Sequence, residues 1–101
     1  MDIEIIARSA DWADRYEAAR REDLPPELIA RLAEDESRIV RWAIALRDDL
    51  PAELLARLAR DEDWLVRQAI ARRSDLPAEL VARLSADTSA RVRRAATRKN
   101  L

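Results

Sequence analysis

Apolar residues recur at helical spacing along most of the chain. One cluster includes Leu28 and Leu32, and a second, after a polar gap, comprises Val40, Ala43 and Ile44. Steps of three and four residues place such side chains on one face of an α-helix. No window shows the sustained alternation of a half-buried strand. The pattern therefore predicts pairs of short helices and no strands.

The whole pattern repeats with a period of 26 residues. Segments 23–48, 49–74 and 75–100 align without a gap, and twelve of the 26 positions are identical in all three. Residues 1–22 match the pattern only loosely. We predict one domain of three two-helix repeats, numbered in chain order and with repeat 3 ending at residue 101, behind a degenerate N-terminal capping unit.

The first helix of each repeat opens at Leu-Pro-x-Glu. Pro25, Pro51 and Pro77 suit the first helical position, where a missing N–H costs nothing. The glutamate two residues later then falls at the third position and can reach back to the helix cap.

The second helix of each repeat is predicted to begin after Ser37, Asp63 and Ser89, which are N-cap residue types at one equivalent position. One helix pair of this length cannot bury its apolar face alone, whereas stacked pairs can. We therefore predict an all-α protein with the architecture of an α-solenoid. Small and polar replacements in repeat 3, such as Ser85 and Thr97, indicate a terminal cap. A fragment of a longer array is the alternative.

The composition excludes several classes of chemistry. The 101 residues include no Gly, His or Cys. A chain without these residues has no glycine loop for phosphate, no imidazole base, no thiolate nucleophile and no zinc or iron–sulfur site of the usual kind. The acidic clusters at 34–36 and 61–63 are interpreted as helix caps and not as cation sites. We expect no enzyme, no cofactor and no metal.

The sequence also bears on the location of the chain. No apolar run is long enough to span a membrane, and the acidic first twenty residues do not resemble a signal peptide. The lack of cysteine fits a reducing compartment. These features predict a cytoplasmic protein that is not bound to a membrane.

Charge is distributed unevenly along the chain. The net charge is −1, from 19 basic and 20 acidic residues, but residues 1–50 carry −5 and residues 51–101 carry +4. An acidic front and a basic back would favour head-to-tail self-association.

A ridge of side chains runs beside the buried stripe of the second helices. It is apolar in repeat 1, with Ile39, Trp42 and Leu46, and becomes basic further along. Exposed Trp and Arg are typical of binding hot spots. An alternative is that Trp12 and Trp42 fill gaps around the irregular first unit. The other candidate partner-binding residues are Trp64, Gln68, Arg72, Arg91, Arg94 and Arg98.

The segment LARDEDWLVRQAIARRSDLPAELVARL at 58–84 resembles the leucine-rich repeat variant family, and the motif Asp-x-x-x-x-Val-Arg resembles HEAT repeats. The resemblance implies a superhelical fold whose second helices line the concave face. It also implies a structural ladder of Asp and Arg between neighbouring repeats. The family's Asn-Pro corner is replaced here by Arg47-Asp48 and its equivalents, and no cysteine cluster is present. The ladder residues are Asp35, Arg41, Asp61, Arg67, Asp87 and Arg93.

The leading functional hypothesis is a scaffold that binds a protein or peptide through the ridge. The second is nucleic-acid binding through the basic segment 90–100, which includes Lys99. The third is a structural module that self-associates head to tail, and a designed scaffold is a further alternative.

Overall fold

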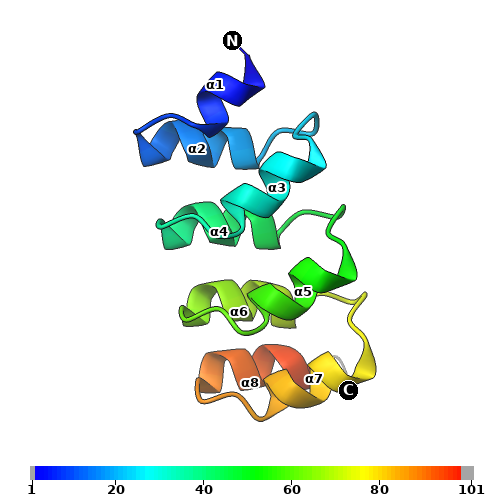
Figure 1. Ribbon diagram of the computed structural model, residues 1–101. Coiled ribbons are helices and arrows are strands. Elements are labelled where there is room, and N and C mark those ends of the chain that lie inside the picture. Colours follow the sequence, from blue (N-terminus) through cyan, green and yellow to red (C-terminus); the bar gives the residue numbers. More distant parts are fainter. Residues whose placement is uncertain (1, 99–101) are drawn as a thin grey trace. The chain divides into compact units, whose positions relative to one another are not determined.

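The computed structural model describes residues 2–98, and all regular secondary structure in this portion of the chain is helical (Figure 1). Lys99 and Asn100, which belong to the predicted basic segment, lie outside the described residues. The prediction of an all-α protein is confirmed. The helices are α1 (Ile3–Ala7), α2 (Trp12–Ala19), α3 (Pro26–Leu32), α4 (Arg38–Ala45), α5 (Ala52–Leu58), α6 (Trp64–Ala71), α7 (Ala78–Ser85) and α8 (Ala90–Thr97).

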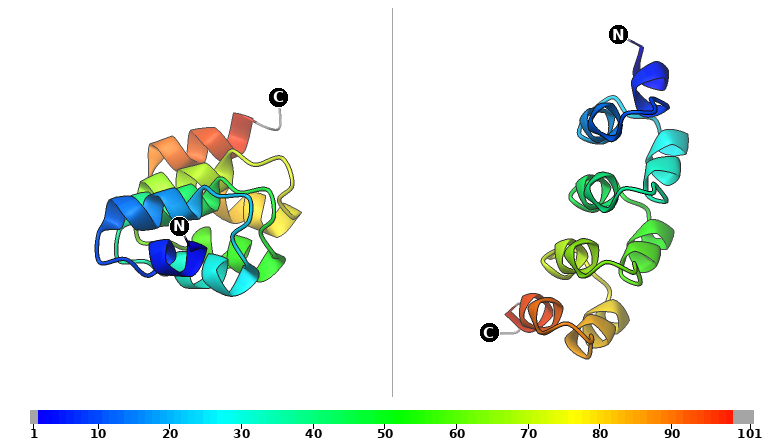
Figure 2. Two further views of the ribbon diagram at one scale, coloured as in Figure 1. Left: turned by 90° about the horizontal axis from the view of Figure 1, so that it is seen from above. Right: turned by 90° about the vertical axis from the view of Figure 1, so that its left-hand side faces the viewer.

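The chain forms two compact units, residues 1–49 and residues 50–101. In unit 1, helices α2 and α4 pack side by side and form one layer. Helices α1 and α3 pack against this layer and form a second one (Figure 2). Leu28, Leu32 and Ile44 are buried between these layers.

Unit 2 is built in the same way, with α6 beside α8 and with α7 packed on α8. Leu58, Ile70, Leu84 and Val92 form its buried interior. Burying one such side chain contributes about 1.5–3 kcal/mol. The prediction of buried apolar faces is confirmed for the residues that define the pattern in repeat 1, since Leu28, Leu32, Val40, Ala43 and Ile44 are all buried.

The first helices of the repeats begin one residue later than predicted. Pro25, Pro51 and Pro77 are N-cap residues with ψ angles of 156°, 158° and 152°, which are extended values. The Pro25 carbonyl accepts from the amides of Leu28 and Ile29 at 3.0 Å each. Each glutamate is thus at the second helical position. It cannot close a capping box, because the N-cap proline has no N–H that could donate to the glutamate carboxylate.

The predicted starts of the second helices are confirmed, since Ser37, Asp63 and Ser89 are their N-cap residues. Only the Asp63 side chain makes a hydrogen bond as a cap, to the amide two residues later at 2.9 Å. The amides of Ser37 and Ser89 instead donate to the carboxylates of Asp35 and Asp87, at 2.8 Å in both cases. The ladder aspartates therefore hold the turns that precede these helices.

The leading segment, although irregular in sequence, folds as a helix pair. Asp11 caps α2 at the position that Ser37 takes one period later. Trp12 is 50% exposed, so it does not fill a gap, and its ring meets Tyr16 edge-on at 6.4 Å. Trp42 is half-buried.

The corners between helices use ordinary backbone angles. Among the described residues, from 2 to 98, none has a positive φ. The glycine-free sequence thus meets no position at which glycine would be required.

The buried Leu84 allows a test of the core of unit 2. Its side chain is 0% exposed, so Leu84→Ala should reduce the free energy of unfolding by about 2–5 kcal/mol. Leu46→Ala is the control, because that side chain is 52% exposed and its loss should cost much less. Urea unfolding followed by circular dichroism measures both. Equal effects of the two substitutions would contradict the assignment of this core.

Candidate functional site

Arginine–aspartate bonds join consecutive helix pairs within each unit. In unit 2, Arg67 Nε donates to Asp87 Oδ1 at 2.9 Å, and Nη2 donates to Oδ2 at 3.2 Å. The Arg67 Nη1 atom donates to the carbonyl of Asp61 at 2.7 Å. The side chains of Arg67 and Asp87 are only 13% and 12% exposed. Arg67 thus donates both to a carbonyl of its own repeat and to the aspartate carboxylate of the next repeat.

Unit 1 contains the same arrangement. Arg15 donates to Asp35 from Nε at 2.7 Å and from Nη2 at 3.3 Å, while its Nη1 donates to the Ser9 carbonyl at 2.9 Å. Arg41 donates from Nη1 to the Asp35 carbonyl at 2.6 Å. The predicted ladder did not include Arg15, although this residue stands 26 residues before Arg41, at the equivalent position of the repeat.

Burial and charge act in opposite directions on the Asp87 carboxyl. Burial alone would raise its pKa. The hydrogen bonds from Arg67 and the Ser89 amide, with the charges of Arg67 and Arg93, outweigh burial and hold the pKa below its ordinary value. In unit 1, the hydrogen bond to Asp35 raises the pKa of Arg15. Both groups are therefore charged at neutral pH and occupied by their ladder partners.

A second set of arginines braces the corners, a role that was not predicted for them. Arg47 pairs with Asp49 through Nε and Nη2 at 2.9 Å each, and its Nη1 donates to the carbonyls of Ala19 and Arg21 at 2.7 and 2.8 Å. The same pairing with an aspartate two residues later recurs at Arg21 and Arg73. The sequence did contain a signal for these ion pairs, because the motif Arg-x-Asp recurs once per 26-residue period.

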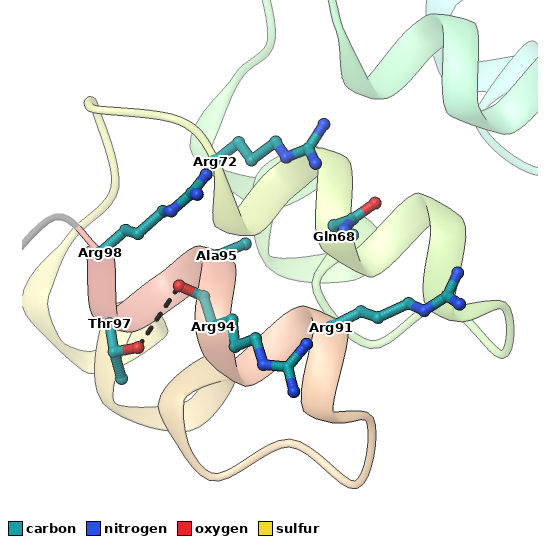
Figure 3. A pocket seen from close by; sticks show the side chains of 7 residues that line it. All are labelled: Gln68, Arg72, Arg91, Arg94, Ala95, Thr97 and Arg98. Atoms are coloured by element: carbon teal, nitrogen blue, oxygen red, sulfur yellow. Dashed lines mark hydrogen bonds between the residues drawn. The ribbon is translucent and has the colours of Figure 1, made fainter.

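A hollow of about 420 Å³ lies on unit 2 over α6 and α8 (Figure 3). We call it the arginine hollow. In Figure 3, Arg98 extends toward Arg72 across the two helices. The Thr97 hydroxyl bonds back to the carbonyl of Arg93 at 2.9 Å. The lining residues are Gln68, Arg72, Arg91, Arg94, Ala95, Thr97 and Arg98.

The arginine hollow has an excess of positive charge. Arg72, Arg94 and Arg98 are exposed, and among residues 2–98 no carboxylate forms an ion pair with any of them. The Arg91 guanidinium lies 4.7 Å from the centre of the Trp64 ring, where it covers one face of the indole. Three cations on one surface without a counter-charge repel each other and favour an anionic ligand.

A second hollow, of about 570 Å³, lies on unit 1 over α2 and α4. We call it the aromatic hollow. Its apolar lining includes Tyr16, Trp42 and Leu46, and the Arg20 guanidinium stands 5.4 Å from the centre of the Tyr16 ring. Leu46 is 52% exposed. The charged residues that also line it are Arg20, Glu22, Arg47, Asp48 and Asp49.

The two hollows occupy equivalent positions of the repeat. Tyr16 and Trp42 line the aromatic hollow, and Gln68 and Arg94 stand at the same position in the arginine hollow. The predicted residues Trp42 and Leu46 therefore meet in unit 1, and Gln68, Arg72, Arg91, Arg94 and Arg98 meet in unit 2. Ile39 and Trp64 are half-buried and do not line either hollow.

Within residues 2–98, no group of three or more His, Cys, Asp or Glu side chains is placed to hold a metal ion. None of the helices described is both long enough and apolar enough to cross a bilayer.

No protein-family model matches the chain, and neither a curated protein nor a solved structure is significantly similar to it. The residues that line each hollow are therefore the basis for a functional proposal.

The lowered pKa of Asp87 predicts a pH-dependent contribution to stability. A carboxyl whose pKa is lower in the folded state stabilises the fold above its unfolded pKa of about 3.9, and this contribution is lost as the pH falls through the folded pKa. Asp87→Asn should cost about 1–3 kcal/mol at pH 7, because Arg67 loses its charged acceptor.

The difference between wild type and Asp87→Asn should shrink on acidification. Urea unfolding from pH 7 down to about pH 3, across the ordinary range of an aspartate, measures it. Asp48→Asn is the matched control, since Asp48 is exposed. A cost for Asp87→Asn that does not change with pH would contradict this origin of its stability.

Proposed function

We propose that this chain is a non-enzymatic scaffold that binds an acidic segment of a protein or peptide in the arginine hollow. The observation that carries the proposal is the group of exposed arginines on α6 and α8 that have no carboxylate partner among residues 2–98. Arginine forms bidentate bonds with carboxylates, which suits recognition of aspartate and glutamate.

The aromatic hollow offers a site for an apolar side chain. Trp42 and Leu46 present apolar surface there, and Asp48 at its edge is exposed. Binding energy in peptide complexes is concentrated in such aromatic and arginine positions. A partner with both apolar and acidic segments would use the two hollows as separate sites.

Nucleic acid is the second candidate, because phosphates also pair with exposed arginines. Several features favour a peptide. Arg91 covers one face of the Trp64 ring, so that face is not free to stack on a base. The hollow has room for a few side chains, and the whole chain has a net charge of −1.

We also propose that the helix pairs continue as one α-solenoid, in keeping with the resemblance to leucine-rich repeat variant and HEAT-like arrays. The support lies in the sequence, because the period passes residue 49 without a gap. Arg41 and Asp61 stand at the ladder positions that Arg67 and Asp87 occupy one period later. The lack of cysteine supports a cytoplasmic location.

Reversing two of the free charges should abolish binding of an acidic peptide. Arg94→Glu with Arg98→Glu should weaken binding of a fluorescent Asp/Glu-rich peptide by at least about tenfold, or about 1.4 kcal/mol. Fluorescence anisotropy at low and moderate salt measures this. Wild-type affinity should fall as salt rises, because exposed charges are screened over about 8–10 Å.

The control is Arg60→Glu with Arg83→Glu, which changes the net charge equally at exposed positions outside the hollow. Trp42→Ala should weaken only a probe that also has an apolar segment. Duplex and single-stranded oligonucleotides form a parallel arm. Equal losses in the hollow and control variants, or tighter binding of oligonucleotides than of peptide, would overturn the proposal.

The solenoid predicts that the two units unfold together. In a chain with Trp12 and Trp64 replaced by Phe, Trp42 fluorescence reports on unit 1 alone. Leu84→Ala in unit 2 should then lower the denaturation midpoint that Trp42 reports, because stacked repeats stabilise their neighbours. An unchanged Trp42 midpoint would show independent units.

A further inference from the structure

Among residues 2–98, no carboxylate forms a hydrogen bond with Arg93, the last of the ladder arginines. Arg93 stands one period after Arg67, and its Nη1 donates to the carbonyls of Asp87 at 2.8 Å and Thr88 at 3.2 Å. In Arg67 the same anchor leaves Nε and Nη2 bonded to a carboxylate. No residue within 2–98 accepts a hydrogen bond from Nε or Nη2 of Arg93.

The Nε and Nη2 atoms of Arg93, which we call its fork, are already positioned to donate to an acceptor. Its anchor to the Asp87 carbonyl matches that of Arg67 to Asp61, at 2.7 Å, and that of Arg15 to Ser9, at 2.9 Å. A side chain ordered before binding loses less conformational entropy when the ligand arrives. Arg93 does not line the arginine hollow, so this site is separate from the proposed peptide site.

The bonds that Arg15 and Arg67 make show which kind of group the Nε and Nη2 atoms of Arg93 can bind. The carboxylates of Asp35 and Asp87 each bind an arginine of the preceding helix pair and also accept the amide of the N-cap residue two positions later. The matching ligand is therefore an aspartate that lies two residues before the N-cap of a helix.

Apolar surface remains on the same face of unit 2. Leu80 and Val81 of α7 are half-buried. Their equivalents in repeat 2, Leu54 and Leu55, are only 7% and 6% exposed. A helix pair packed over α7 and α8 would cover this surface and shield the Arg93 bond from water, as Arg67 and Asp87 are shielded.

We propose that the α7–α8 face of unit 2 binds a helix pair of a partner protein whose helix-preceding aspartate fills the Nε/Nη2 fork of Arg93. The partner is recognised by that carboxylate together with the apolar helix face beside it.

A second copy of the same chain does not supply this carboxylate. Ser9 stands at the ladder position of the leading unit, one period before Asp35. Its hydroxyl donates to Asp14 at 2.7 Å and accepts the Asp11 amide at 3.1 Å, so it replaces the aspartate only as a local cap. The proposed partner must therefore have aspartate at this position.

A variant of the chain can serve as a defined probe. Ser9→Asp supplies the missing carboxylate, Asp14→Asn removes the nearby like charge, and Arg93→Gln prevents the probe from binding itself. This labelled donor is mixed with unlabelled wild-type acceptor and followed by sedimentation velocity. We expect a 1:1 complex that is at least tenfold weaker with an Arg93→Gln acceptor and unchanged with an Arg94→Gln acceptor.

Two controls isolate the carboxylate. A donor with Ser9→Asn in the same background has a similar shape without the charge, and it should lose the complex. A donor that retains Asp14 replaces the first one if circular dichroism shows that the first has lost helix. No complex with a folded donor at about 1 mM, the weak end of specific association, overturns the proposal, as does equal binding to the Arg93→Gln acceptor.

The outcome is independent of the peptide site. Arg93→Gln should leave acidic-peptide binding unchanged, and Arg94→Gln should leave the donor complex unchanged. Loss of both kinds of binding in either variant would show that the two surfaces are not separate and would contradict the inference.

Discussion

In each unit, one aspartate carboxylate connects two helix pairs: Asp35 in unit 1 and Asp87 in unit 2. Asp87 accepts two bonds from Arg67 and one from the Ser89 amide, so a single side chain fixes the distance between helix pairs and the first residue of α8. An exposed ion pair would contribute only about 0–1 kcal/mol. This pair is nearly buried, and Asp87 accepts from both Arg67 and the Ser89 amide, so it both stabilises the unit and sets its geometry. The orientation of α8, and with it the direction of its exposed arginines, follows from this bond.

The same geometry presents different chemistry in the two units. The position beside the buried stripe is aromatic at Tyr16 and Trp42 and polar or basic at Gln68 and Arg94. These side chains take no part in the core or in the ladder, so they can vary without changing the fold. The two hollows therefore differ in chemistry, since the one on unit 1 has an aromatic and apolar lining and the one on unit 2 is lined mainly by arginines.

Local and periodic signals made most of the fold predictable. The prediction identified the N-caps at Ser37, Asp63 and Ser89 and the apolar stripe that includes Val40, because each depends only on nearby residues. The starts at the prolines were wrong by one residue, because a proline with extended ψ caps a helix and does not begin it.

Some features of the site could not be predicted from the sequence alone. The ridge residues were identified, but their separation into one hollow in each unit depends on tertiary packing that the period does not specify. Arg15 was missed because the leading unit matches the repeat only loosely. Trp12 was open to interpretation as a gap filler, and its exposure follows from how α2 packs.

The corners have a consequence for how such a chain can change over evolutionary time. Their backbone angles, without any positive φ in residues 2–98, are accessible to nearly every amino acid. A duplicated segment of 26 residues would therefore retain its turns even after its surface had diverged. Copying such a segment would add one helix pair that packs on its neighbour, and later substitutions at its exposed positions would alter its surface and leave its corners unchanged.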